Sequence, residues 1–102
     1  MTTYNFYDTS SLLLRANNLF DNPEENIIIS SVTLIELENI KTSRFKSEEV
    51  KFQARQITHL LEQNPDKYIC YQFHLSMLDR FKDFDITDDI KILACAIDFD
   101  FT

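Results

Sequence analysis

Acidic residues follow three apolar segments of the chain, at places where a metal-binding site could form. Asp8 comes directly after "YNFY", Glu36 lies a short way past "IIIS", and Asp88 and Asp89 come after "YICYQF" and a polar stretch. Carboxylate oxygens are the ligands that hard divalent cations such as Mg²⁺ prefer. Each acid also has a simpler explanation as a turn residue, a helix cap, a surface residue or a partner of a helix dipole.

The elements that must position these acids alternate between strand-like and helical patterns. We predict strands at 4–8, 27–30 and 68–73, and helices at 10–20, 31–41, 48–63 and from 87 onward, with a loop or short helix at 74–85. This alternation predicts an α/β fold with three layers, in which helices cover both faces of a central parallel sheet. The carboxyl ends of parallel strands meet at one edge of the sheet, so the acids can converge there.

Composition excludes several classes of function. The 102-residue chain contains no glycine, and therefore no P-loop, dinucleotide fingerprint or nucleophile elbow. Its two cysteines, Cys70 and Cys95, show no metal-binding spacing and are expected to be thiols in a reducing compartment. No segment resembles a signal peptide or a membrane span. We expect one soluble, cytoplasmic domain over residues 1–102 that has no membrane contact.

A net charge of −7 argues against passive electrostatic binding of nucleic acid, but the basic residues are unevenly placed. Lys41, Arg44 and Lys46 cluster in "IKTSRFK", after the helix that carries Glu36. With Arg15, they could contact RNA phosphates. The alternative is a solvated loop whose charge balances the acids at the start of the following helix.

Three segments together resemble the PIN domain family: "FYDTSSLL", "IIISSVTLIELENIK" and "TDDIKILACAI". The similarity extends over residues 4–102, and "IELENIK" most resembles members that accompany PhoH-like ATPases. It implies a metal-dependent ribonuclease that uses Mg²⁺ or Mn²⁺. Carried over by position, it implies the following roles: Asp8, Glu36 and Asp89 as catalytic metal ligands, Asp88 as an assisting ligand, and Thr9 and Ser10 as supporting hydroxyls.

The resemblance further implies a fourth strand beside the first, followed by another acid. Because the sequence stops before such a segment, we expect a domain that is incomplete at its C-terminal end. The open side of the first strand would then be covered by further residues or by a second copy in a homo-oligomer. The expected activity is endonucleolytic hydrolysis of RNA. Two alternatives are a non-catalytic PIN-like module, which binds RNA or protein and regulates an attached or partner ATPase, and, less favoured, a phosphoacceptor receiver domain.

Overall fold

A three-stranded parallel sheet lies at the centre of the protein. The structure, a computed structural model, describes residues 3–100; the limits of the predicted domain, residues 1 and 102, lie outside these residues. The strands are β1 (Tyr4–Tyr7), β2 (Asn26–Ser30) and β3 (Tyr68–Tyr71), in the order β1-β2-β3. Both neighbouring pairs are parallel, with Phe6 opposite Ile28 and Ile28 opposite Ile69. The predicted α/β class and parallel sheet are therefore confirmed.

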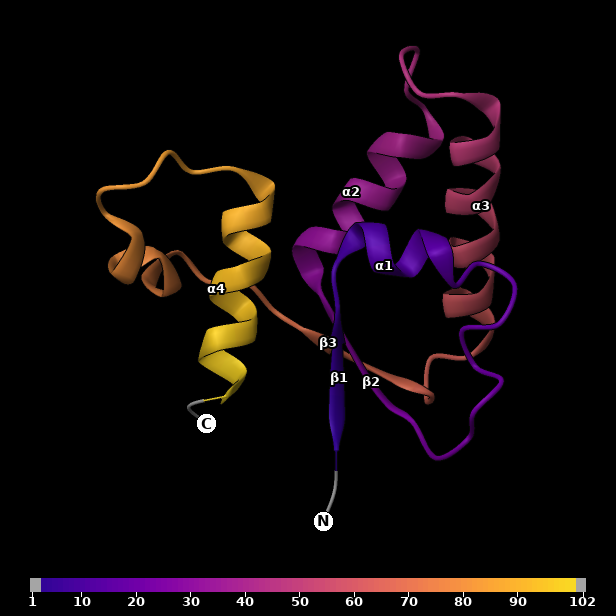
Figure 1. Cartoon of the computed structure of the whole chain (residues 1–102), viewed down its shortest axis with the longest axis horizontal. Helices are drawn as coiled ribbons and strands as arrows, with labels where there is room; N and C mark the ends of the chain where they lie inside the picture. Colours follow the sequence, from indigo (N-terminus) through magenta and orange to yellow (C-terminus); the bar gives the residue numbers. More distant parts are fainter. Residues whose placement is uncertain (1–2, 101–102) are drawn as a thin grey trace.

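Helices cover both faces of this sheet, which gives the three predicted layers. One side carries α1 (Thr9–Leu14), α2 (Ser31–Lys41) and α3 (Glu48–Gln63). The other side carries α4 (Asp88–Asp100), which packs against the 3₁₀ helix η1 (Leu75–Phe81) (Figure 1). Within residues 3–100, β1 is an edge strand, and the expected fourth strand beside it stays a prediction. No helix in this range is long and apolar enough to cross a bilayer.

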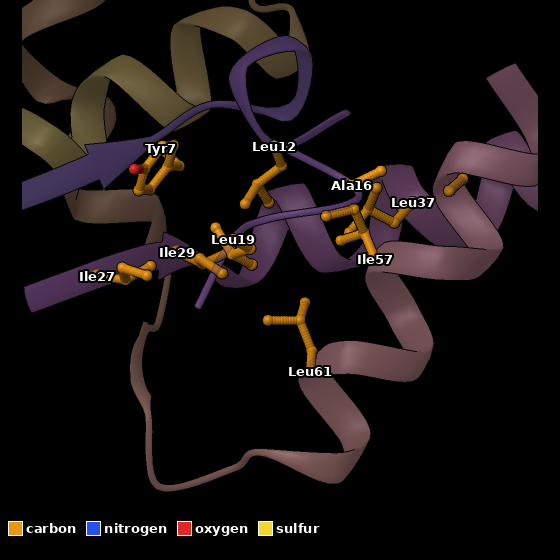
Figure 2. Packing of buried hydrophobic residues seen from close by; sticks show 10 residues of the cluster. Tyr7, Leu12, Ala16, Leu19, Ile27, Ile29, Leu37, Ile57 and Leu61 are labelled. Atoms are coloured by element: carbon orange, nitrogen blue, oxygen red, sulfur yellow. The ribbon is translucent and has the colours of Figure 1, made fainter. Parts of the chain in front are cut away.

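The main core lies between the sheet and the α1–α3 layer. Alternate residues of β2, Ile27 and Ile29, point into it and are buried. The α3 helix contributes Ala54, Ile57 and Leu61, whose spacing places them on one helical face. Figure 2 shows Ile57 and Leu61 of this face in the core. Burial of these apolar side chains is the main force that holds α3 against the sheet.

Contacts between aromatic side chains and one buried polar contact hold α4 against the sheet. The Phe99 ring meets the Tyr4 ring at 5.4 Å and the Tyr71 ring at 5.6 Å between centroids, both edge to face. The Ser30 hydroxyl lies 3.4 Å from the sulfur of Cys95, which is fully buried. Both cysteines are free thiols, although Cys70 is only half-buried. These contacts fix α4, and with it Asp88 and Asp89, against the sheet.

The helix after β1 differs from the prediction at both ends. It begins at Thr9, with Asp8 as its N-cap, rather than at residue 10, and it ends at Leu14 rather than near residue 20. A series of turns follows, yet Leu19 is still fully buried. Leu19 therefore belongs to the core without being helical, and Asn17 and Asn18 before it favour turns over helix.

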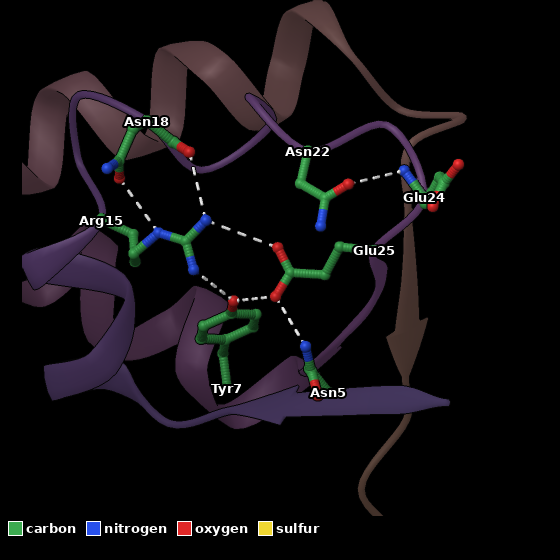
Figure 3. A network of polar contacts seen from close by, with 7 residues as sticks. All are labelled: Asn5, Tyr7, Arg15, Asn18, Asn22, Glu24 and Glu25. Atoms are coloured by element: carbon green, nitrogen blue, oxygen red, sulfur yellow. Dashed lines mark hydrogen bonds and ion pairs between the residues drawn. The ribbon is translucent and has the colours of Figure 1, made fainter. Parts of the chain in front are cut away.

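A polar network ties these turns back to β1 (Figure 3). The Tyr7 hydroxyl donates a hydrogen bond to Glu25, and Asn5 Nδ2 donates to the same carboxylate oxygen at 2.6 Å. The guanidinium of Arg15 donates to the Tyr7 hydroxyl at 2.7 Å and forms an ion pair with Glu25 at 3.4 Å. It also donates to two oxygens of Asn18. Arg15, predicted as a phosphate contact, thus already has partners within the protein.

Candidate metal centre

Asp8 stands at the carboxyl end of β1 and holds the first turn of α1. Its Oδ1 atom accepts a hydrogen bond from the Ser11 backbone N–H at 2.8 Å, which is the usual contact of an N-cap residue. The side chain is otherwise exposed and faces a pocket. Asp8 is therefore a cap, as the simpler explanation requires, and is also placed where a ligand could reach it.

The pocket, of about 390 Å³, brings together the starts of two helices from opposite layers. Asp8 contributes from the start of α1 and Asp89 from the start of α4. Its lining consists of Phe6, Asp8, Ser10, Ser11, Asp89, Ile92, Leu93 and Ala96. Two carboxylates that are 81 positions apart in the sequence thus share one pocket beside the open edge of β1.

Glu36 lies on α2, and the hydroxyl of Thr9 fixes its position. Thr9 Oγ1 donates to Glu36 Oε1 at 2.7 Å, and the Thr9 side chain is itself buried. Burial raises the pKa of Glu36 above its ordinary value, and the negative charges of Asp88, Asp89 and Asp8 raise it further, although the Thr9 bond opposes them. The negative charges of the three aspartates therefore act on Glu36.

The acidic residues lie toward the same end of the sheet, but their carboxylates are not arranged as the ligands of a metal ion. Within residues 3–100, no group of three or more His, Cys, Asp or Glu side chains is arranged to hold a metal ion. Three of these acids already have other contacts: the Asp8 carboxylate accepts the Ser11 N–H, the Glu36 carboxylate accepts the Thr9 hydroxyl, and Asp88 lies 3.9 Å from Lys91. The donor set still suits a hard cation, because a divalent ion would relieve the repulsion between these carboxylates.

The acids at the start of α4 are not its cap. The Thr87 hydroxyl accepts the Ile90 backbone N–H at 3.2 Å, which leaves Asp88 and Asp89 in the first turn. The helix dipole favours acids in the first turn, by roughly 0.3–1 kcal/mol each. Their carboxylates are thus free of capping bonds, and Asp89 is directed to the pocket.

The remaining predicted residues fall into two groups. Ser10 lines the pocket near Asp8, whereas Lys41 is paired with Glu38 at 3.1 Å. Arg44 and Lys46 lie exposed in the loop between α2 and α3.

Sequence reasoning missed Thr33, a fully buried residue whose hydroxyl lies 3.5 Å from that of Thr9. Its position three residues before Glu36 places both on the same face of α2, a spacing that could have identified it.

Replacing Glu36 with glutamine is expected to stabilise the metal-free protein near neutral pH. The folded-state pKa of Glu36 is raised above its ordinary value of 4.5, so the folded protein favours the protonated carboxyl. The stability that the protonated form supports is complete below pH 4.5 and is lost as pH rises through the folded-state pKa, where the charged carboxylate destabilises the fold. Glutamine keeps an oxygen for Thr9 and removes the repelling charge. Thermal melts should show Glu36→Gln a few degrees more stable at neutral pH and equal to the wild type near pH 4. If Glu36→Gln melts at a lower temperature than the wild type at neutral pH, this would contradict repulsion between Glu36 and the aspartates.

Comparison with known proteins gives one match. A family model described as a PIN domain matches residues 6–101, a range that runs from within β1 past the end of α4. No curated protein and no solved structure matches the chain significantly.

Proposed function

The chain belongs to the PIN domain family, and we propose that it is a metal-dependent endoribonuclease that hydrolyses RNA phosphodiester bonds. PIN domains are generally nucleases, and they typically use divalent metal ions. The observation that carries the proposal is the shared pocket of Asp8 and Asp89 at the carboxyl end of the sheet. Glu36 is not among the residues that line this pocket, but its carboxylate is held by Thr9 and its pKa is raised in part by the charges of the aspartates.

Each residue has a distinct role in this proposal. Asp8, Glu36 and Asp89 hold Mg²⁺ or Mn²⁺, and Asp88 adds negative charge at the start of α4. Thr9 positions the Glu36 carboxylate, and Ser10 supports the mouth of the pocket. When bound, such an ion supplies an activated water and stabilises charge on the phosphate and leaving oxygen.

The two free cysteines are consistent with a reducing compartment, and we place the protein in the cytoplasm.

A second candidate is a non-catalytic PIN-like module that binds RNA or a protein, such as a PhoH-like ATPase. One observation favours it: within the described part of the chain, the acids lack a three-ligand arrangement. The open edge of β1 would then offer a surface for a partner or for a second copy of the chain.

Cleavage of a labelled single-stranded RNA separates the two candidates. The 102-residue chain is incubated with the RNA in Mn²⁺ or in EDTA, and the products are resolved on a gel. The nuclease produces internal cuts in Mn²⁺ and none in EDTA. RNA that is bound but remains intact under both conditions supports the non-catalytic module.

A further inference from the structure

The loop between α2 and α3 carries the most exposed large apolar side chain of residues 3–100. Phe45 is 97% exposed, and it lies between two exposed basic residues, Arg44 and Lys46. The loop connects the ends of the two helices that lie far from the sheet, at the tip of the molecule (Figure 1). An aromatic side chain that is exposed to water at such a position contributes almost nothing to the free energy of folding, because it buries almost no apolar surface.

Side-chain contacts hold this loop in a defined turn. The Ser43 hydroxyl accepts two backbone N–H groups, from Phe45 at 3.1 Å and from Lys46 at 3.3 Å. Thr42 ends α2, and Ser47 caps α3 by accepting the Val50 N–H at 3.2 Å. The two helices and Ser43 therefore fix the turn on which Phe45 is presented, and the ordering cost of binding is partly met in advance.

The loop has the opposite charge to the rest of the protein. Residues 42–47 contain two basic residues and no acid, and a third, Lys41, precedes them at the end of α2, although the chain as a whole carries a net charge of −7. Lys41 is neutralised by Glu38 at 3.1 Å, whereas Arg44 and Lys46 form no ion pair with any described residue. Two unpaired cations on either side of an exposed ring suit a ligand that offers both negative charge and a flat apolar face.

We propose that residues 42–47 bind single-stranded RNA, with a base stacked on Phe45 and phosphates held by Arg44 and Lys46. Proteins that bind single strands combine aromatic stacking with basic side chains along the backbone, and a duplex hides the base faces. The choice of RNA among polyanions rests on the proposed function. From Glu36 to Lys41, the last residue of α2, the helix rises only about 8 Å, so the loop begins about one and a half helical turns from one of the proposed metal ligands.

Binding in EDTA tests this loop without depending on cleavage. Anisotropy of a labelled single-stranded RNA should show that Phe45→Ala weakens binding roughly 5- to 150-fold, the range for loss of one stacked base. The matched control is Phe52→Ala, which removes a phenylalanine that is 56% exposed on α3. This variant should bind like the wild type, and both proteins should bind duplex RNA more weakly than single-stranded RNA, a preference that Phe45→Ala should reduce.

Fluorescence gives an independent readout, because the chain contains no tryptophan. Phe45→Trp should retain binding, and single-stranded RNA should quench the emission of its indole ring. Arg44→Gln and Lys46→Gln should each lower the salt dependence of binding, by a slope of about 0.7 for each phosphate that the variant no longer neutralises.

Several outcomes would overturn the loop assignment. These are equal affinities of Phe45→Ala and Phe52→Ala, no binding of RNA in EDTA, or an indole response to anionic vesicles or to a protein but not to RNA. Any of them can occur while the wild type still cuts RNA in Mn²⁺, which leaves the proposed function intact. Conversely, Phe45-dependent binding without cleavage would support the loop assignment and contradict the nuclease.

Discussion

Asp89→Asn is expected to lower Mn²⁺-dependent cleavage of single-stranded RNA by at least about a hundredfold. Loss of a residue that only supports a metal ligand typically costs 10- to 100-fold, and loss of a ligand itself should cost no less. Asparagine has nearly the same shape, and Thr87, not Asp89, caps α4. The fold should therefore persist, with a change of roughly 1 kcal/mol or less from the weaker interaction with the helix dipole. Initial rates and thermal melts of the same preparation measure both effects.

The control for this prediction is Asp66→Asn. Asp66 precedes β3 and lines a different pocket, at the amino end of the strands, together with Lys67. The substitution removes the same charge from the same 102-residue chain, but far from the candidate centre. If Asp89→Asn and Asp66→Asn cleave RNA at the wild-type rate, Asp89 is not a ligand. If both lose activity equally, the effect is one of overall charge.

Glu25→Ala should be among the most destabilising polar substitutions in the protein. The Glu25 side chain is only 9% exposed, and its removal leaves Arg15 and the Tyr7 hydroxyl without their shared partner. Breaking a fully buried ion pair costs about 3–5 kcal/mol, and the partial exposure of Arg15 reduces our expectation to about 2–3 kcal/mol. Chemical denaturation monitored by circular dichroism measures this loss of unfolding free energy.

The matched control is Glu38→Ala, because Glu38 pairs with Lys41 on the surface and is 58% exposed. Exposed pairs contribute about 0–1 kcal/mol, so this variant should unfold almost like the wild type. Equal losses in the two variants would contradict the structural role of the Glu25 network.

The pH dependence gives a further check on Glu25. Burial alone would raise its pKa, but hydrogen bonds from Tyr7 and Asn5 and the charge of Arg15 outweigh it and lower the pKa. The contribution of Glu25 is therefore present above its ordinary value of 4.5 and is lost as pH falls through the folded pKa. The difference between the wild type and Glu25→Ala should shrink in acid, whereas the difference made by Glu36→Gln should grow as pH rises.

The layer order could be predicted from sequence because it depends on periodic apolar patterns. "IIIS" is a continuous apolar run, and Ile27, Ile28 and Ile29 are all buried in the central strand. The face of α3 formed by Ala54, Ile57 and Leu61 follows from helical spacing in the same way. Such patterns predict the fold well because burial of apolar surface is the dominant favourable contribution to the free energy of folding.

The directions of polar side chains could not be predicted, because they depend on tertiary contacts. The hydrogen bond between Thr9 and Glu36 joins residues that are 27 positions apart, and their spacing in the sequence does not predict it. Likewise Arg15, a candidate phosphate contact by charge alone, is held by Tyr7 and Glu25.

The measurement that tests the central claim most directly is binding of Mn²⁺, followed by calorimetry and by melting temperature. An ion that binds only the folded state at a hundredfold excess over its Kd adds about 2.7 kcal/mol. Asp8→Asn is the informative variant, because asparagine caps helices about as well as aspartate and so keeps the bond to Ser11. We predict that Mn²⁺ binds and stabilises the wild type and Asp66→Asn, and acts far more weakly on Asp8→Asn, Glu36→Gln and Asp89→Asn. A melting temperature indifferent to Mn²⁺, or an equal response of all the variants, would contradict a metal centre formed by these acids.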